Sequence, residues 1–229
     1  MKLEVISTCM DDVIVAEANG ADRLELITAF TEGGLTPGIG LVQQAAKTVS
    51  IPVFAMVRPH SRSFVYSEQD LQTMEAEVRA IADSGASGIV LGALTAEGRI
   101  DERALDRLLP LAGSLDVTFH RAFDELEDQL AGLRTLWQYP SIKRILTSAG
   151  PAPAPQSMPA MRRLVEASRD GHVQILAGSG LKRQGIESFI ETTGVEEVHF
   201  GSAVRYGGDS LSPIDPVALR DLADSLRSC

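Results

Sequence analysis

The chain alternates between short apolar runs and longer amphipathic stretches. The apolar runs have the length and composition of strands, and we predict strands at Leu3–Thr8, Arg23–Ile27, Pro52–Val57, Gly88–Leu94, Asp116–His120, Lys143–Thr147, the run from His172 to the turn at Gly178, and Val195–Phe200. Helical spacing predicts helices at Asp11–Asn19, Ile39–Val49, Ser67–Ser84, Asp101–Leu111, Leu126–Gln138, Met158–Ser168, Arg183–Thr192 and Pro216–Arg227. Strands separated by helices in this way form a parallel sheet.

About eight such strand–helix units fit into one chain of 229 residues. This number predicts an α/β fold, a TIM-like (β/α)8 barrel that spans residues 1–229 as a single domain. An open, doubly wound sheet is the alternative, but no Gly-x-Gly-x-x-Gly turn follows the first strand. No shift in composition marks a linker between two domains.

Small residues end the last two predicted strands, at Gly178-Ser179-Gly180 and at Gly201-Ser202. Glycine lets backbone N–H groups approach an anion closely, and the start of a helix adds a positive field. The loops after strands 7 and 8 are the usual phosphate site of a (β/α)8 barrel. We therefore predict an anion-binding corner here, with helices that start near Lys182 and after Ser202; the alternative is that these glycines only make tight turns.

Other loops carry helix-capping signals. Thr36 is expected to cap the helix at Ile39–Val49, with Pro37 at its first position. Ser67 and Asp70 have the spacing of a capping box.

Residues 148–155 contain three alternating prolines, which predict an extended surface loop.

Ionisable side chains lie inside, or directly after, predicted apolar strands: Glu4, Glu25, Arg58, His120 and His199. A charge that faces the interior of a barrel must be paired or it is neutralised. The carboxyl ends of the strands hold the chemistry of such barrels, so these residues are candidate site residues. The alternative is structural: the two glutamates and Arg58 would form an ion-pair network near the barrel axis.

His120 is the first candidate for proton transfer, with Glu25 as a second carboxyl partner. Period-2 alternation in Thr118-Phe-His-Arg-Ala-Phe-Asp124 places Thr118 and His120 on one face of the strand. A titrating imidazole beside Arg121 and a carboxylate that could orient it, Asp124, has the parts of a general acid/base.

The net charge of −10 and the isoelectric point of about 4.9 narrow the classes of partner. An acidic surface argues against nucleic acid and anionic membrane. A small anionic ligand needs only a local positive site, to which Lys182, Arg183 or Arg205 could contribute. No apolar run approaches the length of a membrane span, and the N-terminus lacks the apolar core of a signal peptide.

The two cysteines, Cys9 and Cys229, make neither a disulfide framework nor a zinc motif, which fits a reducing cytoplasm. His120, His199 and Glu25 would make a two-histidine, one-carboxylate set for a divalent metal only if the fold brought them together. A soft ion such as Cu(I) prefers sulfur ligands. The candidates are Cys9, Met10 and Met56.

Motifs along nearly the whole chain resemble the CutC family, named for copper homeostasis. They are Gly20-Ala-Asp-Arg-Leu-Glu-Leu26, Glu32-Gly-Gly-Leu-Thr-Pro37, Val57-Arg-Pro59 with Phe64-Val-Tyr-Ser67, Thr118-Phe-His-Arg-Ala-Phe-Asp124, Ile145-Leu-Thr-Ser148 and Val198-His199. The resemblance implies a TIM-like barrel, a cytoplasmic location, a homodimer or higher homo-oligomer, and copper binding with a role in copper homeostasis. The motif positions carried over are Glu25, Arg58, His120, Arg121, Asp124 and His199.

The chain departs from the family pattern at its sulfur positions. Ile27 stands where several relatives have a cysteine, and Cys9 lies a few residues late. We therefore expect low Cu(I) affinity. Two functions remain open: copper homeostasis, which the resemblance implies, and an enzyme that acts by acid/base chemistry on a small anionic substrate, with phosphorylated compounds among the candidates.

Overall fold

The computed structural model describes residues 1–228, so Cys229 lies outside the described residues. Eight parallel strands close into a barrel in sequence order, from β1 to β8, with β8 paired back to β1. They are β1 (Lys2–Ser7), β2 (Arg23–Leu26), β3 (Val53–Met56), β4 (Gly88–Leu91), β5 (Asp116–Phe119), β6 (Ile142–Thr147), β7 (Gln174–Ala177) and β8 (Glu197–Phe200). The predicted TIM-like fold is confirmed, and the open sheet is excluded.

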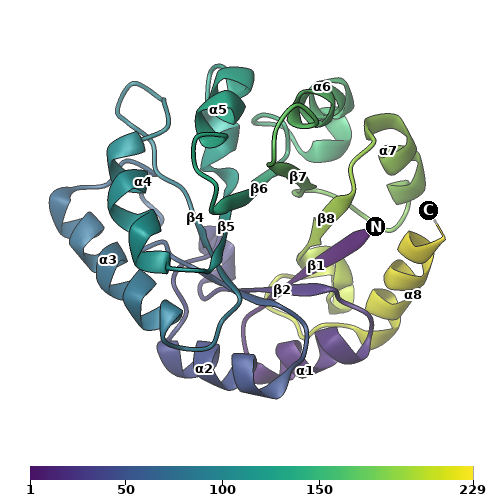
Figure 1. Cartoon of the computed structure of the whole chain (residues 1–229). Coiled ribbons are helices and arrows are strands. Elements are labelled where there is room, and N and C mark those ends of the chain that lie inside the picture. Colours follow the sequence, from purple (N-terminus) through teal and green to yellow (C-terminus); the bar gives the residue numbers. More distant parts are fainter. Residues whose placement is uncertain (229) are drawn as a thin grey trace.

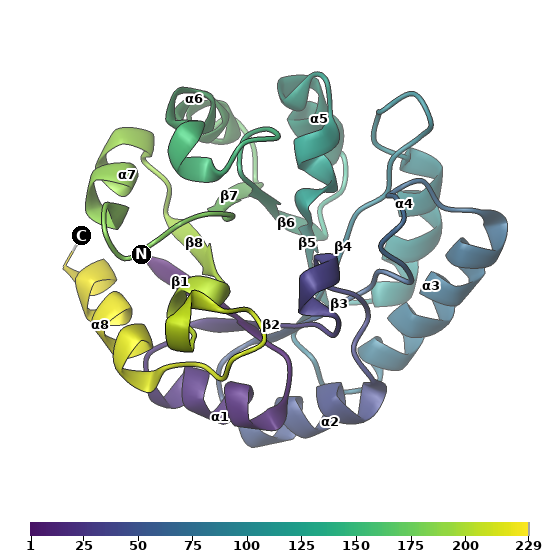
Figure 2. The same cartoon turned by 180° about the vertical axis from the view of Figure 1, so that it is seen from behind.

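A ring of helices surrounds the strands (Figure 1). They are α1 (Met10–Ala18), α2 (Ile39–Thr48), α3 (Glu68–Ala82), α4 (Glu102–Leu108), α5 (Gln129–Leu136), α6 (Met158–Ser168), α7 (Ile186–Thr193) and α8 (Pro216–Arg227). Short turns lie in front of the strands when the barrel is seen from the side drawn in Figure 2, among them the yellow-green segment that follows β8.

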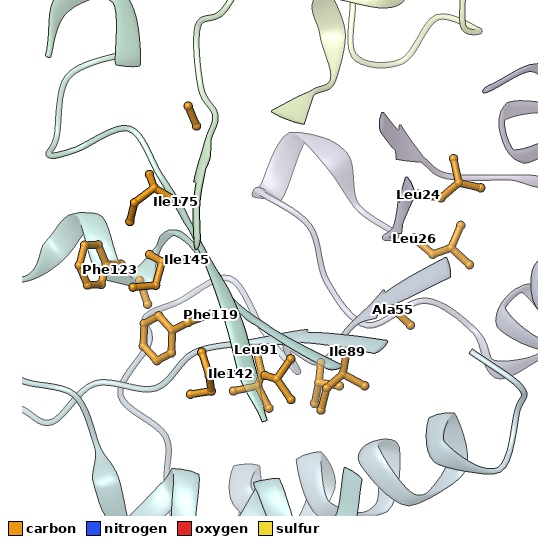
Figure 3. Close-up of a cluster of buried hydrophobic side chains, with 14 of the residues drawn as sticks. Leu24, Leu26, Ala55, Ile89, Leu91, Phe119, Phe123, Ile142, Ile145 and Ile175 are labelled. Carbon is orange, nitrogen blue, oxygen red and sulfur yellow. The ribbon is translucent and has the colours of Figure 1, made fainter. Parts of the chain in front are cut away.

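The main hydrophobic core lies between the strands and the helices. Alternate strand residues point outward into it, such as Leu24 and Leu26 of β2 or Ile89 and Leu91 of β4, as Figure 3 shows. The opposite set of residues faces the barrel axis. There a smaller apolar cluster, formed by Ile6, Ile27, Phe54, Met56 and Val90, fills part of the interior. The rest of the interior is polar and charged.

Two predicted features of helix starts are wrong. α2 begins at Ile39 as predicted, but its N-cap is Gly38 and not Thr36, whose Oγ1 instead donates to Glu77 Oε2 at 2.8 Å and accepts from the Arg58 amide at 2.9 Å. α7 begins at Ile186, so no helix starts near Lys182. The capping box of Ser67 and Asp70 at the start of α3 is confirmed.

Candidate functional site

A cavity of about 1050 Å³ opens at the carboxyl ends of the strands. Residues of β1, β2, β3, β6 and β8 line it, and so do the turns after β5, β7 and β8. Glu25, Arg58, His120, His199 and Asp124 all lie on its wall. The fold therefore brings these predicted site residues to one cavity, as the carboxyl face of a barrel does.

Glu4, Glu25 and His199 form a buried line of groups inside the barrel. Glu4 is ionised, so it accepts a hydrogen bond from His199 Nδ1 at 2.7 Å. His199 Nε2 then faces Glu25 Oε2 at 3.8 Å, and Glu25 Oε1 has no hydrogen-bond partner among the described residues. The bond to Glu4 thereby fixes which ring nitrogen of His199 points at Glu25.

The two glutamates of this line have opposite pKa shifts. Burial acts to raise the pKa of Glu4, but Arg23 and His199 outweigh it and lower that pKa to about 2. For Glu25, burial outweighs the attraction of His199 at 3.8 Å and raises the pKa of the carboxyl group to about 7. Burial opposes the charged form of His199, yet Glu25 and Glu4 outweigh it and raise the pKa of the imidazole. Glu25 can thus exchange a proton near neutral pH.

Arg58 is held by the Glu32-Gly33-Gly34 turn. Its Nη1 donates to the carbonyls of Glu32 and Gly34 at 3.2 and 3.3 Å. Both glycines have a positive φ, 82° and 87°, and a Cβ on Gly34 would press against Ile27 and Met56. The turn therefore requires glycine, and it orients an arginine that pairs with no carboxylate within residues 1–228.

His120 is buried and uncharged. Its Nδ1 accepts the backbone N–H of Ala122 at 3.2 Å, so the proton resides on Nε2, which has no partner in the described part of the chain. Burial, and after it the charge of Arg58, lowers the pKa of His120 to about 3. Gly92 leaves room for the ring, because a Cβ there would lie 2.6 Å from Nδ1. His120 is therefore a neutral hydrogen-bond donor.

Asp124 does not orient His120. Its two oxygens accept from Thr147 Oγ1 at 2.5 Å, from the amide and hydroxyl of Ser148, and from Arg121 Nε at 2.8 Å. These bonds attach the turn after β5 to the end of β6. The pairing that the sequence suggested is wrong because a backbone amide already occupies the Nδ1 of His120.

The predicted anion corner is partly open to a ligand. The amides of Ser179, Gly180, Gly201 and Ser202 donate to no acceptor among the described residues, and these residues line the cavity. Gly178 differs, since its amide donates to the Thr147 carbonyl at 3.0 Å and a Cβ on it would collide with Leu146. Gly178 therefore serves packing and offers no amide to a ligand.

The basic residues near this corner have separate roles. Lys182 lines the cavity and forms no ion pair in residues 1–228, whereas Arg183 pairs with Asp221 at 3.4 Å. Arg205 is buried and pairs with Asp12 at 2.8 Å, so the expectation that it adds a charge at the cavity rim is wrong.

Three charged residues of the interior were missed by the sequence reasoning. Arg23 donates to both Glu4 and Glu197, and Arg144 approaches Glu197 at 3.4 Å. The guanidinium groups of Arg23 and Arg144 also lie 5.4 and 4.9 Å from the centre of the Phe54 ring. Period-2 alternation was the available signal, since Arg23 lies two residues before Glu25 and Glu197 two before His199.

These residues do not offer a site that fits Cu(I). Cys9 is exposed, and Met56 packs in the apolar interior cluster. Glu4, Glu25 and His199 have ligand atoms within 4.8 Å of one another, which suits a harder ion by ligand type. Both oxygens of Glu4 are already bonded, however, one of them to the Arg23 guanidinium. A cation would have to compete with that fixed positive charge.

Comparisons with known proteins agree with the sequence motifs. The model of the CutC family matches residues 1–204. A human protein named "Copper homeostasis protein cutC homolog" is 37% identical over 86% of this chain and 71% of its own length. A CutC protein of Yersinia pseudotuberculosis is 39% identical over 86% of this chain and 77% of its own.

Solved structures give the same result. A putative copper homeostasis protein CutC from Streptococcus agalactiae has a TM-score of 0.82 and 27% identity, covering 87% of this chain and 97% of its own. Phosphoribosyl anthranilate isomerase from Thermococcus kodakaraensis has a TM-score of 0.65 at 14% identity, covering 100% and 99%, and shares the fold. The chain belongs to the CutC family.

Proposed function

We propose that this protein acts in copper homeostasis, the role carried in the names of its relatives. The observation that supports this function is membership of the CutC family over residues 1–204. The proposed location is the cytoplasm. Within residues 1–228, no helix has both the length and the apolar content needed to cross a bilayer.

Growth of a deletion strain in graded copper tests this role. We expect growth in copper to fall without the gene and to return with the wild-type gene. Because Cys9 has no second thiol beside it within residues 1–228, a Cys9→Ser gene should restore growth as well as the wild type does. An unchanged copper response in the deletion strain would contradict the proposed role.

A second candidate function is an acid/base enzyme that acts on a small anionic substrate. One observation favours it: a buried carboxyl group with a pKa of about 7, Glu25, lies on the same cavity wall as a neutral histidine donor, His120. We assign proton transfer to Glu25 and hydrogen bonding of a developing oxyanion to His120. This reverses the order that the sequence suggested, because burial keeps His120 from accepting a proton.

The open corner at Ser179–Gly180 and Gly201–Ser202 would hold the anionic group of this substrate. Four amides that donate to no acceptor within residues 1–228 support this part of the proposal, and Lys182 adds a positive charge nearby. Backbone amides bind a phosphate without requiring a buried basic side chain.

Solvent exchange over a panel of compounds tests the enzyme candidate while its substrate is unidentified. Small phosphorylated and carboxylated compounds would be incubated with the protein in heavy water and followed by proton NMR. We expect deuterium to replace a carbon-bound hydrogen in at least one compound, and Glu25→Gln to abolish this exchange. The exposed Glu187→Gln is the matched control. Equal exchange in wild type and Glu25→Gln would remove Glu25 from the role.

A further inference from the structure

Two hydrogen-bond donors without acceptors share one wall of the cavity. Arg58 is 7% exposed and His120 3% exposed, yet Arg58 Nε and His120 Nε2 have no partner in the described residues. A buried donor without a partner costs stability, because it loses its hydrogen bonds to water and gains none in return. Two such donors at the wall of one cavity are typical of a ligand-binding site whose ligand is absent.

Phe64 joins the two donors into one surface. Its ring centre lies 4.6 Å from the Arg58 guanidinium carbon and 4.8 Å from the centre of the His120 ring. The aromatic ring excludes water from both side chains, which strengthens any charge-assisted hydrogen bond they make. With Nη1 of Arg58 engaged by backbone carbonyls, its Nε edge remains without an acceptor.

The charge of this wall suits a single negative group. Arg58 carries one positive charge and has no carboxylate partner within residues 1–228. His120 contributes an N–H donor and no charge, because the Ala122 amide occupies its Nδ1. The planar fork of arginine matches the geometry of a carboxylate.

We propose that Arg58, His120 and Phe64 form a carboxylate subsite, so that the ligand of this cavity is a small carboxylic acid. The subsite lies across the barrel mouth from the corner at Ser179 and Ser202, because β3 and β5 lie opposite β7 and β8 in the closed barrel. The ligand would therefore have acidic groups at both ends. Only its second acidic group rests on the anion corner of the proposed function.

Side-chain nitrogen NMR with formate, the smallest carboxylate, tests the subsite. We expect formate to shift the His120 Nε2–H and Arg58 Nε–H resonances of the wild type to saturation. Arg58→Gln should weaken formate binding at least tenfold, since it removes a charge-assisted hydrogen bond. The exposed Arg162→Gln, which loses only a surface ion pair with Glu166, is the matched control and should bind formate as the wild type does.

An NMR titration with inorganic phosphate tests the proposed anion corner independently of the carboxylate subsite. Phosphate is expected to shift the amides of Ser179 and Ser202 in both the wild type and Arg58→Gln. If phosphate leaves these amides unmoved while formate shifts His120, the corner fails and the carboxylate subsite stands. If formate leaves both wild-type side-chain resonances unmoved, the subsite is refuted, whether or not Arg58→Gln folds.

Discussion

The two halves of the barrel interior differ in whether their buried arginines are paired with carboxylates. Toward the amino ends of the strands, Arg23 and Arg144 are paired with Glu4 and Glu197 through ion contacts of 3.4 Å or less. Toward the carboxyl ends, Arg58 has no carboxylate partner within residues 1–228. His120 and Glu25 there each keep a buried atom without a hydrogen-bond partner.

The charged residues of the amino half therefore serve the fold, and those at the mouth serve ligand binding, although both sets come from the same barrel. Opposite charges in the amino half neutralise one another, so they fill the interior without a ligand, although Arg144 Nε has no hydrogen-bond partner among the described residues. Unpaired groups at the mouth lower the stability of the empty protein, and such groups collect where a ligand completes their hydrogen bonds. Glu4 connects the halves, because it bonds Arg23 on one side and His199 on the other.

Removing the shared carboxylate of the amino half should have the largest effect. Glu197→Gln leaves Arg23 and Arg144 close together without their common counter-charge, and breaking a buried ion pair in this way costs about 3–5 kcal/mol. Urea unfolding at neutral pH measures the loss. The neighbouring Glu196→Gln, an exposed position, is the control and should stay within about 0.5 kcal/mol of wild type. A loss below about 1 kcal/mol for Glu197→Gln would show that the amino half is not a stabilising network.

Neutralising Glu25 should instead stabilise the folded protein at high pH. Its pKa is raised from 4.5 to about 7 by burial, so the folded state is penalised as the pH rises from 4.5 through 7. Above pH 7 the penalty reaches about 3 kcal/mol, and below pH 4.5 it vanishes. Glu25→Gln should therefore unfold at higher urea than wild type at pH 8 and at similar urea at pH 4. A variant that is less stable at pH 8 would contradict the conclusion that burial outweighs the attraction of His199 for Glu25.

His120 should act as a donor and not as a proton carrier. Once solvent exchange identifies a substrate, His120→Phe is expected to slow exchange on the order of a hundredfold, a typical loss for one oxyanion donor. His120→Gln retains an N–H group and should lose less. Exchange that falls equally in both variants, with a pH profile that reports a titrating imidazole, would return His120 to the role of general acid/base.

Cysteine substitution should have the smallest effect. Cys9 is exposed, and no second thiol is present in residues 1–228, so Cys9→Ser should leave Cu(I) affinity unchanged and well below that of a dedicated copper chaperone. Competition with a chromophoric Cu(I) chelator measures this. Stoichiometric copper that resists the chelator in wild type and is lost in Cys9→Ser would overturn the expectation.

Much of the fold follows from local pattern. The apolar runs placed every strand, because each is bounded by a small or polar turn and followed by a helical stretch. Period 2 placed Thr118 and His120 on one face of their strand, and the apolar strands around Glu4, Glu25 and His199 marked these residues as candidates for the barrel interior. The misplaced start of α7 has a local cause: Gly185, with a φ of 87°, precedes Ile186, and the preceding residues form a loop along the cavity.

The pairing of the site residues could not be predicted in the same way. Whether Asp124 meets His120 or Ser148 depends on the packing of β5 against β6, which no local spacing encodes. The burial of Arg205 against Asp12 joins residues far apart in the chain. Homo-oligomer formation stays a prediction, which light scattering on the purified protein would measure.

The central claim is that the mouth of the barrel is a ligand site and that the paired amino half is not. A crystal structure of the protein grown in phosphate tests it most directly. We predict a phosphate within hydrogen-bond distance of the Gly180 and Ser202 amides and none among Arg23, Arg144 and Glu197. A phosphate bound among Arg23, Arg144 and Glu197, or a mouth with no anion at either these amides or Arg58, would contradict the claim.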